Sequence, residues 1–227
     1  MKKSFLFALV LCLLMPTIES IAQNSREYVR NSIKRWGECK NVAITKYNGD
    51  LALYGRNGWA GTGLPSGLED ALSELNRNEE LIDDVQITEN GKWLVLYGDN
   101  GFQWQGIPYS LENKLREYNN NSYVVTSVTF NDAGDWIIIS QEYISASAGW
   151  IQDWLKEGMD KYGSLWAACV TSDAMVACYE RGYRFYGNVP DDLKSALKET
   201  DMDVYRIKIA GTAWFIGDGK GRYRYNM

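Results

Sequence analysis

The sequence of 227 residues contains no histidine. This absence excludes Ser-His-Asp and Cys-His catalytic sites, because both depend on an imidazole that accepts the proton of the nucleophile. It also argues against the ordinary zinc, copper and non-haem iron sites, since imidazole is among their commonest ligands. The loops NDAGD and GDGKGR match neither the EF-hand spacing nor a P-loop. We therefore expect no catalytic residue, no metal and no cofactor.

Long hydrophobic runs are missing too, apart from one near the N-terminus. Lys2 and Lys3 precede an apolar run over residues 5–15, which is too short to cross a bilayer as a helix. The tripeptide SIA, ending at Ala22, has small residues at the two positions that signal peptidase reads. The pattern predicts a bacterial secretory signal peptide over residues 1–22. We expect export to the periplasm, cell surface or medium, with no membrane insertion of the mature chain.

Positive charge is not in excess. The chain has 24 Lys and Arg against 29 Asp and Glu, and without the signal peptide the balance is 22 to 28, a net charge of −6. Nucleic acids and anionic membranes attract proteins with clustered positive charge. We therefore expect neither of them as a partner.

Proline is scarce as well, and its few positions are regular. Of the four prolines, Pro65, Pro108 and Pro190 close the similar phrases GTGLP, QGIP and GNVP. The first two are 43 residues apart, and the next interval of 82 is two periods of 41. Such spacing is the mark of tandem repeats.

Alignment on the prolines gives five copies of one unit, which start near Ser25, Ser66, Tyr109, Gly149 and Asp191. Each copy begins with a helical pattern such as SGLEDALSELN, in which leucines recur at i and i+4. A hairpin pattern and a shorter third strand follow, and the Asn-Gly pairs favour tight turns. The predicted fold class is α+β, with five tandem αβββ repeats of about 41–43 residues in one domain over residues 23–227.

Around the second repeat we predict strands over residues 85–88, 93–97 and 102–105 and a helix near residues 111–118. One αβββ unit cannot bury both its helix and its sheet, so the units must stack. We prefer a closed five-bladed ring, propeller-like with a helix in place of the outer strand, over an open solenoid. The layout is similar to the pentein ring, which also has five α/β units. No pentein motif is present, and pentein enzymes need a histidine.

Three cysteines follow the signal peptide: Cys39, Cys169 and Cys178. The stretch ACVTSDAMVAC predicts a hairpin with Asp173 and Ala174 at its turn. That register places Cys169 opposite Cys178 at a non-hydrogen-bonded position, where side chains come closest. Export permits a disulfide, so we predict this bond and a free Cys39. The alternative is two small hydrophobic residues on one face of the sheet.

Aromatic residues are abundant, with nine Trp and fifteen Tyr. Trp93 and Trp136 recur at matching positions, which predicts a role in the core. The alternative for the repeated aromatic residues is a rim of aromatic faces that stack on a sugar or a peptide. The third repeat is different, because SQEYISASAGW replaces the usual third-strand phrase. Tyr143 and Trp150 lie in or beside this departure and are the first candidates for ligand binding. The alternative is neutral drift at a solvent edge.

Gln103 and Arg184 are second candidates for ligand binding. They occupy matching positions in two third strands and would converge if those strands lined a central channel. We interpret the protein as an exported, non-catalytic binding or scaffolding module for a glycan, a peptide or a protein partner. The alternative is a carboxylate-dependent, glycosidase-like hydrolase, which needs no histidine. The acidic residues favour helix first turns and hairpin turns, where carboxylates usually cap or are solvated.

Overall fold

The computed structural model describes residues 18–227 of the chain. It contains five units, each with one helix followed by three strands in a separate antiparallel sheet. Most of the predicted signal peptide lies outside the described residues, and α2 (Ile18–Trp36) runs across the predicted cleavage site. The predicted α+β class and the five αβββ units are confirmed.

The units are numbered 1 to 5 along the chain. The bounds of their elements are α2 (Ile18–Trp36), β1 (Asn41–Ala43), β2 (Leu51–Tyr54) and β3 (Gly58–Gly61) in unit 1; α3 (Leu68–Arg77), β4 (Ile82–Ile87), β5 (Trp93–Tyr97) and β6 (Gly101–Gln105) in unit 2; α4 (Tyr109–Asn120), β7 (Val125–Phe130), β8 (Trp136–Ser140) and β9 (Ile144–Ala146) in unit 3; α5 (Gly149–Tyr162), β10 (Leu165–Val170), β11 (Ala174–Tyr179) and β12 (Gly182–Gly187) in unit 4; and α6 (Asp191–Glu199), β13 (Arg206–Ala210), β14 (Ala213–Gly217) and β15 (Tyr223–Tyr225) in unit 5. The divergent phrase of unit 3 therefore still forms a third strand, β9, but one of only three residues.

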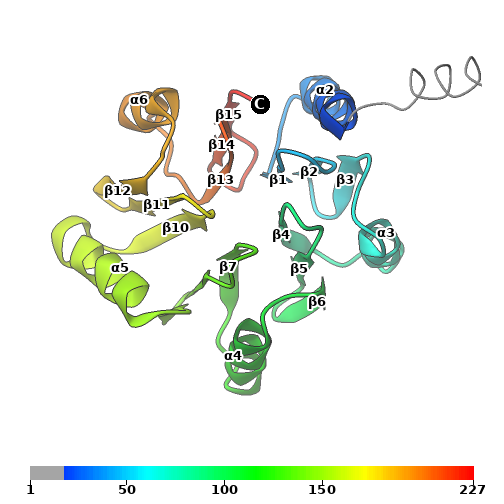
Figure 1. Ribbon diagram of the computed structural model, residues 1–227. Helices are drawn as coiled ribbons and strands as arrows, with labels where there is room; N and C mark the ends of the chain where they lie inside the picture. The colour runs from blue at the N-terminus through cyan, green and yellow to red at the C-terminus, as the bar shows by residue number, and fades with distance from the viewer. Residues whose placement is uncertain (1–17) are drawn as a thin grey trace, which may run out of the picture.

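The five sheets lie around a common centre, with the helices at the periphery (Figure 1). The first strand of each sheet is innermost, and β1, β4, β7, β10 and β13 contact one another in turn. The third strands lie farther out. The suggestion that third strands line a central channel is therefore wrong, and Gln103 of β6 and Arg184 of β12 do not converge at the centre. Within the described residues, no sheet continues from one unit into the next.

The hydrophobic core consists of five clusters between neighbouring sheets. Four of them combine one face of a sheet, the helix that follows it and the facing side of the next sheet. The fifth joins units 5 and 1, and includes Phe215 of β14, Val29 of α2 and Val42 of β1. Trp93 and Trp136 are only 5% and 4% exposed, which confirms their predicted place in the core.

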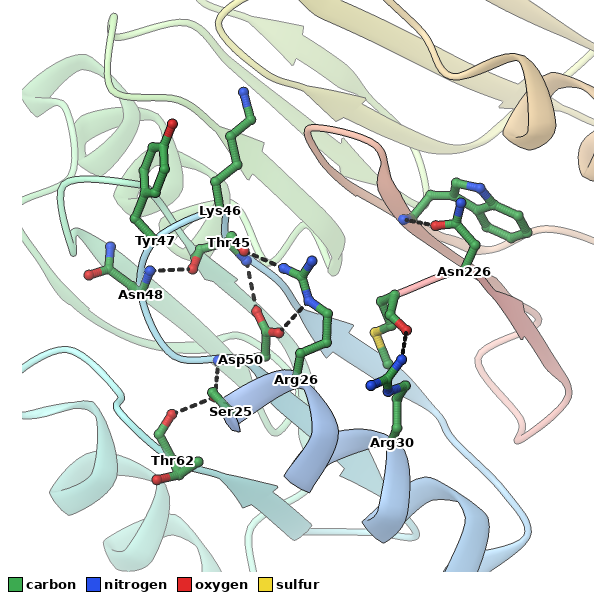
Figure 2. A network of polar contacts seen from close by, with 12 residues as sticks. Ser25, Arg26, Arg30, Thr45, Lys46, Tyr47, Asn48, Asp50, Thr62 and Asn226 are labelled. Atoms are coloured by element: carbon green, nitrogen blue, oxygen red, sulfur yellow. Dashed lines mark hydrogen bonds and ion pairs between the residues drawn. The ribbon is translucent and has the colours of Figure 1, made fainter. Parts of the chain in front are cut away.

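Polar contacts of α2 join the two ends of the described chain (Figure 2). Arg26 Nε lies 2.8 Å from Asp50 Oδ2, and Ser25 Oγ accepts a hydrogen bond from the Asp50 amide at 2.7 Å. Burial raises the pKa of the Asp50 carboxyl, and the ion pair with Arg26 opposes that shift. One turn further along the helix, Arg30 donates to the carbonyl oxygen of Met227 at 3.1 Å. Helix α2 thus holds both the first hairpin of the described chain and Met227.

The predicted hairpin register around the cysteines is wrong by two residues. Cys169 lies opposite Val176 and Cys178 opposite Ala167, and both thiols are free in the structure, as is Cys39. The two cysteines are diagonal neighbours on one face, a position with Cα atoms about 7–8 Å apart. A disulfide needs Cα atoms within roughly 4.4–6.8 Å. Both side chains instead pack as small hydrophobic groups against α6.

A threonine at the turn accounts for this register. The Thr171 amide donates to the carbonyl oxygen of Ala174 at 2.9 Å, and Thr171 Oγ1 accepts from the Ala174 amide at 2.9 Å. The same hydroxyl also accepts from the Asp173 amide at 3.3 Å. These bonds close the turn around Ser172 and Asp173, one residue earlier than the sequence pattern predicts.

The structure predicts three unreactive free thiols. Burial raises the pKa of Cys39 to about 12, and it also raises the pKa of Cys169 and Cys178. Because the thiolate is the reactive form, none should react with iodoacetamide at pH 8 in the folded protein. In denaturant, all three should be alkylated without prior reduction, as peptide mass spectrometry would show. A Cys169–Cys178 peptide that is released only by reduction would contradict the observed register.

Candidate binding surface

Three of the innermost strands carry a polar residue at the same position of the repeat, and β13 carries one two residues later, on the same face of the strand. Asn41 of β1, Asp84 of β4, Ser127 of β7 and Lys208 of β13 are all buried. The Asp84 carboxylate accepts from Asn41 Nδ2 at 2.7 Å, from Lys208 Nζ at 2.7 Å and from Ser127 Oγ at 3.3 Å. One carboxylate of unit 2 thus connects units 1, 3 and 5.

A second ion pair, between Lys40 and Asp83, flanks the Asp84–Lys208 pair at the start of the innermost strands. Lys40 Nζ lies 3.7 Å from Asp83 Oδ1. Burial lowers the pKa of Lys40 and raises that of Asp83, and their mutual attraction opposes both shifts. The neighbouring Arg206 lowers both pKa values. These groups belong to units 1, 2 and 5, so they too act between units.

Removal of the central carboxylate should be costly. Asp84→Ala leaves the Lys208 ammonium buried without its partner, and such a loss typically costs about 3–5 kcal/mol of stability. The control is Glu112→Ala, which removes a surface ion pair with Arg116 and should cost only about 0.3–0.5 kcal/mol. Urea unfolding at pH 7 measures both free energies. Equal losses for the two variants would show that the Asp84 contacts do not hold the units together.

A central pocket with a volume of about 80 Å³ opens where the innermost strands enter their turns. Every unit contributes to its lining, with residues 44 and 46, 86–89, 130–132, 170–172 and 209–211. Its polar groups already join neighbouring turns. Glu89 accepts from the Lys46 amide at 2.9 Å, Asp132 accepts from Thr88 Oγ1 at 2.7 Å, and Asn131 Nδ2 donates to the carbonyl oxygen of Thr171 at 2.9 Å. These contacts give the pocket a structural role.

The outer surface of unit 4 carries an exposed aromatic pair. Trp150, in the first turn of α5, is 52% exposed, and Tyr186 of β12 is 53% exposed. Their ring centroids are 5.6 Å apart at an interplanar angle of 46°. All nine tryptophans lie in the described part of the chain, and of these Trp150 alone is exposed. An exposed tryptophan beside an exposed tyrosine is typical of a contact surface.

Two further side chains extend this pair into what we term the α5–β12 patch, made of Trp150, Trp154, Arg184 and Tyr186. Trp154 lies one turn after Trp150 on the same helix face, and Arg184 shares a strand face with Tyr186. The Arg184 guanidinium carbon is 4.8 Å from the centre of the Trp154 ring. Arg184 also donates to the Trp154 carbonyl oxygen, and its Nη2 lies 3.1 Å from Glu157 Oε2. The patch is therefore held in place by contacts between α5 and β12.

The other two predicted residues lie elsewhere. Tyr143 is 51% exposed but packs against Tyr123, with ring centroids 4.5 Å apart, at the boundary of α4 and β9. Gln103 is half-buried in β6, opposite Val95. The structure thus brings together Trp150 and Arg184, while Tyr143 and Gln103 belong to other parts of the surface.

Sequence reasoning left Tyr186 out of the predicted site. Tyr186 could have been included, because it follows Arg184 by two residues and alternate residues of a strand lie on one face. The contact with Trp150 could not be read in the same way, since it depends on how closely α5 approaches β12.

No family model matches the chain, and the comparison with curated proteins finds no match. Among solved structures, the chain is similar to the C-terminal domain of gp131 from bacteriophage phiKZ, with 12% sequence identity and a TM-score of 0.38. The alignment covers 66% of this chain and 52% of that one, so the chain spans about half the length of its structural neighbour. A likeness at this level carries no argument about function.

Two other findings concern residues 18–227. No helix there is both long enough and apolar enough to span a bilayer. Over the same residues, no three Cys, Asp or Glu side chains come together in a way that could hold a metal ion.

The different burial of the tryptophans predicts different costs of truncation. Trp93→Ala should lose about 3–5 kcal/mol, as large core truncations do. Trp150→Ala should change stability by only about 0.5 kcal/mol, because its ring is half exposed and belongs to none of the five core clusters. Urea unfolding of both variants checks this. A loss for Trp150→Ala as large as that for Trp93→Ala would make Trp150 a core residue.

Proposed function

We propose that this chain is an exported, non-catalytic binding or scaffolding module, and that the α5–β12 patch is its contact surface for a glycan, a peptide or a protein partner. The observation that carries the proposal is the exposed Trp150–Tyr186 pair. Aromatic rings offer flat apolar area at a low cost in conformational entropy, so they are common anchors in binding sites. Arg184 adds hydrogen-bond donors at the margin of the same surface.

We also propose that the five units form a closed, propeller-like ring. The fifth core cluster, between units 5 and 1, supports closure, because a linear stack of five units would have only four such clusters. The contact of β1 with β13 and the bond from Arg30 to Met227 support it as well. A closed ring has no terminal unit that needs a cap, and it holds the patch on a rigid frame.

The placement of the acidic groups favours binding over the alternative, a carboxylate hydrolase. Such an enzyme needs two carboxyl groups facing one cleft. The three buried acids of the described chain are instead paired with cations, Asp50 with Arg26, Asp84 with Lys208 and Asp218 with Arg222. This pairing is typical of structural carboxylates.

The test is a screen of the chain from residue 23 onward against a glycan array and a phage-displayed random peptide library. Ligands that emerge should bind Trp150→Ala at least about tenfold more weakly than wild type. The control is Tyr109→Ala, because Tyr109 is 77% exposed at the start of α4 and makes no comparable aromatic pair. Equal binding by wild type and both variants would place the contact surface elsewhere.

A further inference from the structure

The outer edge of the unit 4 sheet is an open strand edge. Strand β12 is outermost in its sheet and, among the described strands, pairs only with β11. At six residues it is the longest of the five third strands, since β3, β6, β9 and β15 have four, five, three and three. Its pairing runs from Gly182 to Gly187 without a bulge.

The register shows which backbone groups of β12 point outward. The Asn188 amide donates to the carbonyl oxygen of Asp173 at 2.9 Å. Because antiparallel pairs alternate, Tyr186 and Arg184 also exchange hydrogen bonds with β11. The amide and carbonyl groups of Tyr183 and Phe185 therefore face away from the sheet. No backbone group of the described chain bonds to them from that side.

Several of the usual protections of an edge strand are absent here. Edge strands commonly avoid unwanted pairing by being short, by bulges, by prolines or by free charges. Strand β12 has neither a bulge nor a proline, and its single charged residue, Arg184, is engaged by Trp154 and Glu157 of α5. Such an edge is a template for one more strand.

The flanking helices decide what kind of strand can reach the edge. Tyr183 and Phe185 pack on the cluster that contains α6, while Arg184 bonds to α5 on the opposite face. Strand β12 therefore lies between two helices (Figure 1). Another folded sheet that approached edge-on would meet both helices, whereas a single extended chain needs only the space of one strand, about 4.8 Å from β12.

From these contacts we propose that β12 binds an extended peptide segment as a fourth strand, next to the Trp150–Tyr186 pair. The backbone groups of Tyr183 and Phe185 supply main-chain hydrogen bonds. Alternate peptide side chains face Tyr186 and Trp150 on one side and Tyr183 and Phe185 on the other. This inference rests on the proposed binding function and specifies its ligand as a peptide.

A matched pair of variants separates the backbone amide from the side chain. Phe185→Pro and Phe185→Ala both remove the phenyl ring. Only proline also removes the outward-facing backbone N–H, and its own ring occupies the space where a peptide carbonyl would accept from that N–H. Proline is tolerated on an edge strand where the amide is not part of the ladder. The probes are peptides selected from a random library on the wild-type chain. Phe185→Pro should bind them about tenfold or more weakly than Phe185→Ala, with thermal melts verifying that both variants fold.

Two measurements keep the test decisive if Phe185→Pro does not fold. Amide hydrogen exchange at Tyr183 and Phe185 in the wild-type chain should slow when a selected peptide is added. Methylation of the peptide amides that face β12 should also weaken binding, while methylation of the amides that face away should not.

Several outcomes would overturn strand addition. The first is equal binding of peptides by Phe185→Pro and Phe185→Ala. The second is that added peptide leaves the amide exchange rates at Tyr183 and Phe185 unchanged. The third is a peptide library that yields no binder. If glycans bind and Trp150→Ala abolishes that binding, the proposed contact surface is supported, but the assignment of its ligand as a peptide is wrong. If Trp150→Ala leaves all binding unchanged, the contact surface itself is wrong.

Discussion

The central constraint on this structure is the buried ion pair between Asp84 of unit 2 and Lys208 of unit 5, with Nζ 2.7 Å from Oδ1. Burial of two charges costs several kcal/mol for each ion, so such a pair adds little net stability over apolar residues of the same size. Its value lies in what it specifies. The carboxylate also accepts from Asn41 and Ser127, so one residue sets the relative positions of four units. An alternative stacking of similar units would leave these groups buried without partners.

The sequence predicted the repeating elements well because their signals are local. Leucine stripes, Asn-Gly turns and prolines at a fixed period are sufficient to define each helix and hairpin. Pairing of Cys169 with Cys178 failed for a physical reason. A one-residue slip would turn every side chain to the other face, but a two-residue slip keeps each on its own face. Hydrophobic alternation therefore cannot distinguish the two registers, and the hydroxyl of Thr171 decides between them.

The sequence pattern of the strands also could not predict how far each strand lies from the centre of the molecule. Polar residues alternate with aromatic ones in the third strands, and this pattern does not tell whether such a strand faces a channel or the periphery. A better signal lay in the first strands. Asn41, Asp84 and Ser127 share one repeat position there, and Lys208 lies two residues later on the same strand face. Polar residues that recur on one face of buried strands indicate a common meeting point, because each must find a partner there.

The α5–β12 patch arises where two linked positions of the repeat change together. In unit 3, Trp136 Nε1 donates to Ser110 Oγ at the start of the helix, at 3.0 Å. In unit 4 the corresponding strand position is Met175, which has no such donor, and the corresponding helix position is Trp150. This helix position is exposed in both units, so the larger side chain of Trp150 extends into the solvent. Because the core lies between sheets, a change at this site leaves the frame intact. One unit of a repeated scaffold can in this way acquire a contact surface that its neighbours lack.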